Sequence, residues 1–104
     1  MEHVLKIKDE YYEAVASGFK RFEIRNDDRG YQVGDTIRFT DLDGNQRRGV
    51  WAITYILRDC PEYGLKEGYA ILGIDNGYGG TINFKAADNT VKSIPTYEKG
   101  WQTK

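Results

Sequence analysis

The residues best suited to chemistry lie close together in the first third of the chain: Lys20, Glu23, Arg25, Asp28 and Arg29. Arg25 and Arg29 can each donate paired hydrogen bonds to a phosphate or to a base edge, and Lys20 supplies a mobile positive charge. Glu23 and Asp28 can accept hydrogen bonds from exocyclic amines. Together these side chains suit a polar, planar, anionic ligand.

The spacing around these residues predicts how they are presented. After Gly18 the pattern changes to a period of two, in which Phe22 and Ile24 alternate with charged residues. A strand with this pattern is expected to bury Phe22 and Ile24 and to place Arg21, Glu23 and Arg25 together on the opposite face. The sequence therefore predicts a charged face that follows directly on a helix end.

The same charges also suit a purely structural role. Glu23, Arg25, Asp28 and Arg29 can form a lattice of ion pairs that holds the following loop against the rest of the fold. Both interpretations stay open at the level of sequence.

The single histidine, His3, and the single cysteine, Cys60, limit the available chemistry. They exclude an intrachain disulfide, a cysteine-based metal site and a multi-histidine metal centre, and they disfavour a serine–histidine triad. We interpret Cys60 as a bystander thiol, and we expect function without a metal or a cofactor. His3 is more typical of a packing residue near a strand start than of a chemical group.

The composition predicts one soluble domain. The chain has 104 residues, of which 39% are hydrophobic and 30% charged, and its formal net charge is −1. Without a basic excess, we expect no extended duplex footprint, and a short or single-nucleotide ligand fits better. The longest mostly apolar stretch, 50–57, is too short for a membrane span, and no secretory signal is visible, so we expect a cytoplasmic protein.

The expected elements follow from periodicity and turn residues. Asp9 is the expected N-cap of a short helix, Gly18 is expected to end it, and Asp43-Gly44 is typical of a hairpin turn. The expected helix is 10–17, and the expected strands are 3–8, 21–25, 36–40, 47–57 and 69–74.

Beyond Asp75 the sequence changes character. Three glycines come in quick succession, and 81–85 and 90–94 are weak strand candidates. We interpret residues 76–104 as a C-terminal appendage, either an extra hairpin or a partly disordered tail. Tyr97 and Trp101 are large enough to dock a protein partner there.

Residues 18–25 have the pattern G-x-K-x-x-E-x-R, which resembles the signature of the ASCH superfamily. The segments 3–7, 26–35 and 64–69 are also similar to one ASCH-related family of small bacterial and phage proteins of undetermined function. The resemblance implies an α+β fold, a small PUA-like β-barrel with one or two short helices, spanning residues 1–75. It also implies a ligand cleft beside the signature and keeps His3, in the family-like opening, as a secondary candidate for ligand binding.

The superfamily resemblance implies nucleotide chemistry, because ASCH and PUA-like domains include RNA-binding modules, readers of modified nucleotides and a small amidohydrolase of N-acetylated cytidine. The catalytic lysine and threonine of that hydrolase correspond to Lys20 and Glu23, and a carboxylate can act as a general base towards water but not as a hydroxyl nucleophile. The leading hypothesis is a binding module for RNA or a nucleotide-like ligand. The alternatives are a metal-independent amidohydrolase of N-acylated nucleosides, with Lys20 and Glu23 catalytic, and a phage-borne protein-interaction module.

Overall fold

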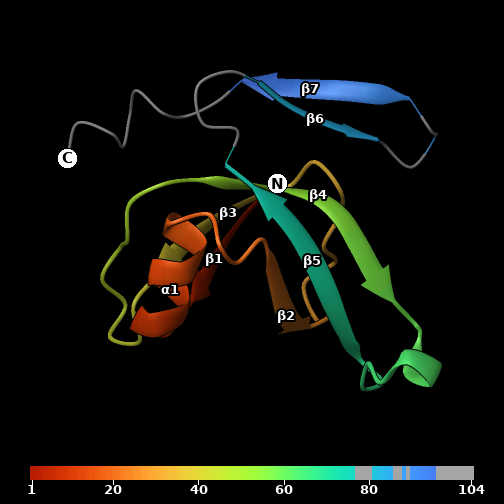
Figure 1. The fold of residues 1–104 in the computed structure, drawn as a ribbon, viewed down its shortest axis with the longest axis horizontal. Coiled ribbons are helices and arrows are strands. Elements are labelled where there is room, and N and C mark those ends of the chain that lie inside the picture. The colour runs from red at the N-terminus through yellow and green to blue at the C-terminus, as the bar shows by residue number, and fades with distance from the viewer. Residues whose placement is uncertain (77–80, 86–87, 89, 96–104) are drawn as a thin grey trace.

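The computed structural model describes residues 1–76, 81–85, 88 and 90–95, which form seven strands, one α-helix and one short 3-10 helix (Figure 1). In chain order these elements are β1 (Glu2–Lys6), α1 (Asp9–Ala16), β2 (Phe22–Asn26), β3 (Thr36–Thr40), β4 (Trp51–Arg58), the 3-10 helix η1 (Pro61–Tyr63), β5 (Tyr69–Asp75), β6 (Thr81–Lys85) and β7 (Val91–Pro95). None of the helices in these described ranges is long and apolar enough to cross a membrane.

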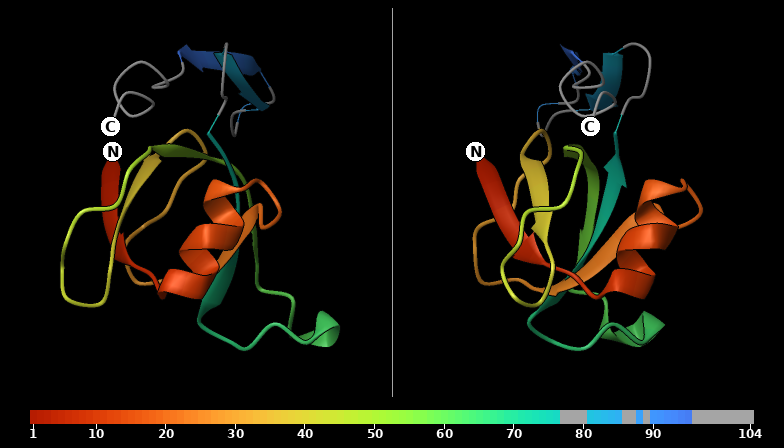
Figure 2. Two further views of the ribbon diagram at one scale, coloured as in Figure 1. Left: turned by 60° about the vertical axis from the view of Figure 1, so that its left-hand side comes forward. Right: turned by 90° about the vertical axis from the view of Figure 1, so that its left-hand side faces the viewer.

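Five strands form one mixed sheet in the order β1-β3-β4-β5-β2. The β1 and β3 strands are parallel, and the other neighbours are antiparallel. The sheet curls strongly, and α1 lies beside its concave side (Figure 2). The structure therefore confirms an α+β fold with a barrel-like, curled sheet.

The core lies inside this curl and depends on apolar side chains from both sheet and helix. Tyr12 and Val15 are the buried residues of α1. The Tyr12 ring meets the Trp51 ring edge-on at 6.2 Å between centroids, and the Trp51 ring lies 5.4 Å from that of Phe39. Burial of each large apolar side chain contributes about 1.5–3 kcal/mol. Trp51 belongs to this core.

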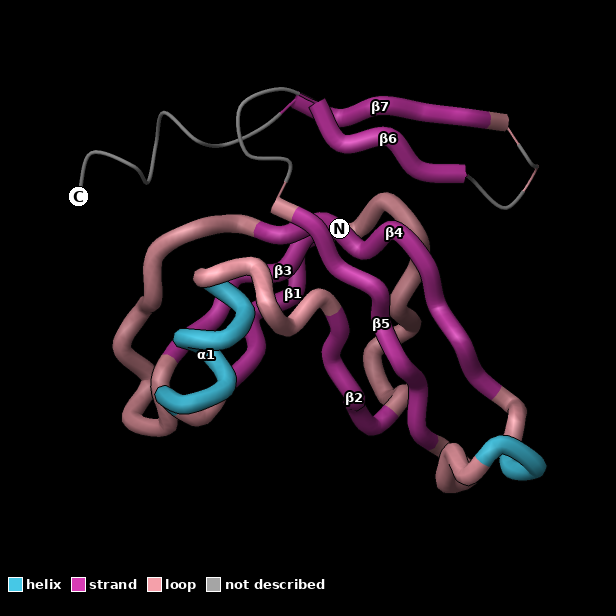
Figure 3. Tube along the Cα trace, in the orientation of Figure 1, coloured by secondary structure: helices cyan, strands magenta, loops and turns pink. Residues whose placement is uncertain are grey.

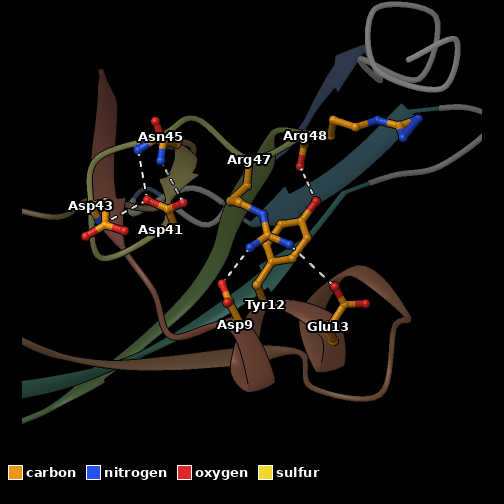
Figure 4. Close-up of polar contacts among 8 residues, drawn as sticks. All are labelled: Asp9, Tyr12, Glu13, Asp41, Asp43, Asn45, Arg47 and Arg48. Carbon is orange, nitrogen blue, oxygen red and sulfur yellow. Dashed lines mark hydrogen bonds and ion pairs between the residues drawn. The ribbon is translucent and has the colours of Figure 1, made fainter.

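The helix begins one residue earlier than expected. Asp9 is the first helical residue, and Lys8 holds the N-cap position without a side-chain hydrogen bond to the helix. The prediction of Asp9 as N-cap was wrong because its carboxylate instead accepts a hydrogen bond from Arg47 Nη1 at 2.7 Å (Figure 4). Gly18 follows the helix with φ +82°, as predicted for a left-handed cap.

Arg47 and Arg48 attach the loop before β4 to the helix. The Arg47 guanidinium lies 4.0 Å from the centroid of the Tyr12 ring and also reaches the Glu13 carboxylate at 3.4 Å. The Tyr12 hydroxyl donates a hydrogen bond of 2.8 Å to the Arg48 carbonyl (Figure 4). Because these contacts, and a left-handed Gly49 at φ +98°, break the extended backbone, β4 starts at Trp51 and not at the expected Arg47.

The turn after β3 is built around one carboxylate. Asp41 Oδ1 accepts hydrogen bonds of 2.9 Å from the backbone amides of Asp43 and Asn45 (Figure 4). Hydrogen bonds from the backbone and side chain of Asn45 lower the pKa of the Asp41 carboxyl. Gly44 has φ +91°, so the turn forms where the Asp-Gly pair predicted it.

After Asp75 the five-stranded sheet ends and a separate two-stranded antiparallel sheet, β6-β7, follows. It is drawn in blue in Figure 1, and β6 contacts β4. The two strands predicted at 81–85 and 90–94 are thus present as β6 and β7. Tyr97 and Trp101, proposed to dock a protein partner, lie outside the described residues.

We predict that Gly49→Ala destabilises the fold more than Gly44→Ala. A Cβ at Gly49 would lie 2.7 and 2.8 Å from carbons of the Trp51 ring, whereas a Cβ at Gly44 meets nothing within 4 Å. Both changes add left-handed strain of about 1–2 kcal/mol, and overpacking adds about 1–3 kcal/mol at Gly49 alone. Urea unfolding measures the difference, and equal losses for the two variants would contradict the role of the Trp51 contact.

Candidate functional site

The face of β2 that carries Glu23 meets the core, whereas the sequence predicted that the face with Phe22 and Ile24 would be buried. Glu23 is buried, with 4% of its surface exposed, whereas Phe22 and Ile24 are 43% and 54% exposed. The reason is the register with β5, in which Glu23 lies opposite the fully buried Leu72 and Ile24 lies opposite Ile71. Opposite residues of an antiparallel pair share a face, so the core position of Leu72 places Glu23 inward. The prediction that Phe22 and Ile24 are buried was wrong.

Two cations accompany the buried Glu23 carboxylate. Lys20 Nζ contacts its Oε1 atom, and Arg25 Nε donates to its Oε2 atom at 3.0 Å. Lys20 Nζ also donates to the Phe22 carbonyl at 2.8 Å. An unpaired carboxylate at this depth would be strongly destabilising, and these donors compensate for its loss of water. The three predicted site residues Lys20, Glu23 and Arg25 are therefore one connected unit.

This unit lies in a pocket of about 650 Å³ between the start of α1, the segment that precedes it and β2. Figure 3 shows how the loop after α1 leads directly into β2. The pocket is lined by Lys6, Ile7, Lys8, Tyr11, Lys20, Phe22, Glu23, Ile24, Arg25, Asn26, Leu42 and Tyr69. Among these, the cationic side chains outnumber the one carboxylate, and the aromatic rings lie beside them.

The aromatic and cationic parts of the pocket are in contact. Lys20 Nζ lies 4.9 Å from the centroid of the Phe22 ring and 5.5 Å from that of the Tyr11 ring. An aromatic face offers a stacking surface to a planar group, and a neighbouring ammonium attracts an anionic one. The pocket thus places aromatic surface beside a positive charge.

Arg25 and Arg29 also connect the two ends of the sheet. Arg25 Nη2 donates to the Lys6 carbonyl at 2.7 Å, and Arg29 Nη1 donates to the Val4 carbonyl at 3.0 Å. These carbonyls belong to alternate residues of β1, whose other edge pairs with β3. Guanidinium groups therefore bridge β1 to β2 and its following loop, at the place where the curled sheet has no backbone pairing.

Asp28 and Arg29 do not line the pocket. Their side chains are largely exposed and lie 3.9 Å apart. Since Arg29 is engaged by β1, the structural interpretation accounts for its position better than ligand contact does. The expected cluster thus divides into an inner part in the pocket and an outer part on the surface.

His3 lies on β1, away from the pocket, and is 4% exposed. Its Nε2 atom is 2.8 Å from Asp35 Oδ2, and its ring packs on the Tyr31 ring with centroids 4.7 Å apart. Asp35 also accepts a hydrogen bond of 3.0 Å from the Gln32 amide. The structure thus places His3 in a buried packing role and not beside the other candidate residues.

Sequence reasoning missed several lining residues. Lys6 and Lys8 flank the strand-to-helix junction shortly before Tyr11, and this spacing could have indicated that the two lysines lie near the pocket. Tyr69 belongs to β5 and is distant in sequence, so no local pattern connects it with β2. It reaches the site because Asn26 pairs with it across the sheet.

These observations define a class of protein, a small α+β domain with a curled mixed sheet and a basic, aromatic pocket at a helix-to-strand junction. Residues 2–74 match the family described as Domain of unknown function (DUF3850), and the chain belongs to this family. The matched range ends at the last residues of β5. A comparison with curated proteins gives no match.

We predict that Asp35 makes the stability of the fold acid-sensitive. Burial raises the pKa of this carboxyl, but the hydrogen bonds from His3, the Gln32 amide and the N-terminal ammonium together outweigh burial and hold the pKa below its usual value of 3.8. A lowered folded-state pKa gives a stabilisation that is complete above the unfolded pKa and is lost as the pH falls through the folded one. Asp35→Asn should therefore lower the free energy of unfolding by about 1–3 kcal/mol at neutral pH.

The measurement is urea unfolding between neutral pH and pH 2. The difference in the free energy of unfolding between the original chain and Asp35→Asn should become smaller as the pH falls below 3.8. Asp28→Asn, at an exposed carboxylate, is the matched control and should change little. A difference in the free energy of unfolding that stays constant across this pH range would contradict the role of Asp35 in the acid sensitivity.

Proposed function

We propose that the chain binds RNA or a nucleotide-like ligand in the pocket between α1 and β2. The observation that carries this proposal is the joining of Lys20, Glu23 and Arg25 in a pocket that also contains exposed aromatic surface. A phosphate suits the cationic rim, and a base suits the Tyr11 and Phe22 rings. The resemblance of residues 18–25 to the ASCH signature supports the same ligand class and a PUA-like relationship.

The distribution of charge within the pocket supports one ligand orientation. Lys6 and Lys8 line the side formed by the segment before α1, whereas Glu23 lies at the β2 side. A phosphate is favoured near the lysines, and an exocyclic amine is favoured near the carboxylate. The ligand would then lie across the pocket, with its base towards β2.

The charge of the whole chain limits the size of the ligand. The formal net charge is −1, so favourable electrostatics are confined to the pocket and its rim. A single nucleotide or a short single strand can satisfy such a site. An extended duplex, which is bound by neutralising many phosphates, cannot. The proposed setting is the cytoplasm, where such ligands are abundant.

We predict that Lys20→Ala and Lys8→Ala each weaken binding of a short, mixed-sequence single-stranded RNA about tenfold, the usual effect of losing one charge-assisted contact. Lys92→Ala, at an exposed lysine of β7, is the matched control and should bind as the original chain does. Fluorescence anisotropy measures all four proteins. The logarithm of affinity should fall with the logarithm of salt with a slope of about −0.7 for each phosphate contact.

Absence of binding by the original chain to this RNA and to every nucleoside monophosphate would refute the proposed function. Unchanged affinity in Lys20→Ala, with the fold intact by circular dichroism, would refute the assigned pocket.

A second candidate function is the hydrolysis of an N-acylated nucleoside. The direct contact between the Lys20 ammonium and the buried Glu23 carboxylate favours it, because such a pair can act in acid–base chemistry. Glu23 would take a proton from a water molecule as the water oxygen adds to the acyl carbonyl carbon. Lys20 would stabilise the oxyanion and protonate the leaving nitrogen, and the C–N bond would break to give a carboxylic acid and an amine. The proton on Glu23 would then pass to Lys20, which it contacts, and restore both groups.

We predict, for this second candidate, that the original chain deacylates N4-acetylcytidine and that Glu23→Gln lowers the rate at least about a hundredfold, the usual contribution of a general base. Lys20→Ala should abolish turnover, and Lys92→Ala should leave it unchanged. Liquid chromatography of the nucleoside products measures the rate. A lack of turnover over a panel of N-acylated nucleosides would exclude the hydrolase and leave the binding function standing.

A further inference from the structure

The backbone of β2 has one edge that the sheet does not use. Among the strands that the structure describes, β2 is the last of the five-stranded sheet and pairs only with β5 (Figure 1). At the two ends of this pairing, the Ile74 amide donates to the Arg21 carbonyl at 3.0 Å and the Asp27 amide donates to the Gly68 carbonyl at 2.8 Å. Hydrogen-bonded and non-hydrogen-bonded pairs alternate along an antiparallel ladder. Every second residue of β2, counted from Arg21, therefore directs its backbone groups towards β5.

The residues between them, Phe22, Ile24 and Asn26, direct their amides and carbonyls to the open edge. The Phe22 carbonyl accepts a hydrogen bond from Lys20 Nζ at 2.8 Å, and the Asn26 carbonyl accepts one from the Asp28 amide at 2.9 Å. In the described part of the chain, no other residue contacts the Ile24 amide or carbonyl through a hydrogen bond. Ile24 thus offers a donor and an acceptor, side by side, at the centre of the edge.

Ile24, which carries this donor–acceptor pair, lines the pocket. The other four residues of β2 line it too, as does Tyr11 of α1. Addition of another strand would require open backbone groups at several alternate residues of β2. The carbonyls of Phe22 and Asn26, the next edge-facing residues on either side of Ile24, already accept hydrogen bonds. One planar group with an adjacent acceptor and donor fits this edge better than a peptide does.

We propose that the backbone amide and carbonyl of Ile24 bind the Watson–Crick edge of an unpaired nucleobase. This proposal rests on the proposed function and specifies what the pocket recognises. The unpaired edges of the common bases carry an adjacent hydrogen-bond donor and acceptor, and single-stranded nucleotides are recognised through such edges. Base pairing occupies the same atoms, so the pocket would select unpaired bases.

The first experiment compares each nucleoside monophosphate with an analogue whose Watson–Crick donor is methylated. The pairs are UMP with N3-methyl-UMP, GMP with N1-methyl-GMP, AMP with N6,N6-dimethyl-AMP, and CMP with N4,N4-dimethyl-CMP. Isothermal titration calorimetry should show at least a tenfold loss of affinity for the analogue of whichever parent nucleotide binds. Because the phosphate and ring are retained, this loss reports on the edge alone.

The second experiment removes the Ile24 amide by Ile24→Pro. Proline is tolerated on an edge strand where the lost N–H faces away from the ladder, and Glu23 before it is already extended. Lys92→Ala, which lies outside the pocket on β7, is the control. Ile24→Pro should weaken binding of the parent nucleotide about tenfold, and Lys92→Ala should bind it as the original chain does.

The outcomes separate this inference from the function on which it rests. If a monophosphate binds and Lys20→Ala weakens it, but the methylated analogue binds equally well, the pocket is correct and edge recognition by Ile24 is overturned. If no monophosphate binds the original chain, the proposed function fails and the inference with it. The methylated analogues need no variant, so they decide the matter even where Ile24→Pro does not fold.

Discussion

The buried carboxylate of Glu23 is the interaction on which the site depends. Its position follows from the register of β2 on β5, which turns it inward beside the core residue Leu72. A charge at this depth requires donors, and Lys20 and Arg25 supply them from either side. Lys20 and Arg25 are thereby held at the wall of the pocket. The pairing of the Glu23 carboxylate with these two cations therefore also fixes the geometry of the candidate site.

Polar side chains also connect the two end strands of the curled sheet. Its two end strands, β1 and β2, are not paired with each other, and arginine side chains from β2 and the loop after it reach the free carbonyls of β1. Arg25 takes part in both arrangements, as a partner of Glu23 and as a bridge to Lys6. The opening between the end strands is therefore held by polar side chains, which leaves room for a pocket where a closed ladder would leave none.

Several elements could be predicted from the sequence because their signals are local. The left-handed Gly18, the turn at Asp43-Gly44 and the strand at 36–40 all lie where the pattern placed them. The convergence of Lys20, Glu23 and Arg25 was also predictable, since they lie three and two positions apart along one helix-to-strand junction. The start of β4 was not, because Arg47 is drawn to α1 by partners at Asp9 and Glu13 that are remote in sequence.

The sequence by itself determined the order of the helix and strands and the composition of the charged segment, because both arise from neighbouring residues, but it did not determine where β4 begins. Only the tertiary structure decided which face of β2 is buried. Period-two alternation defines two faces but does not say which one meets the core, and here the pairing with β5 assigned Glu23 to the interior. It also decided that His3 pairs with Asp35 and that Tyr69 reaches the pocket, because contacts between distant segments exist only once the sheet has formed.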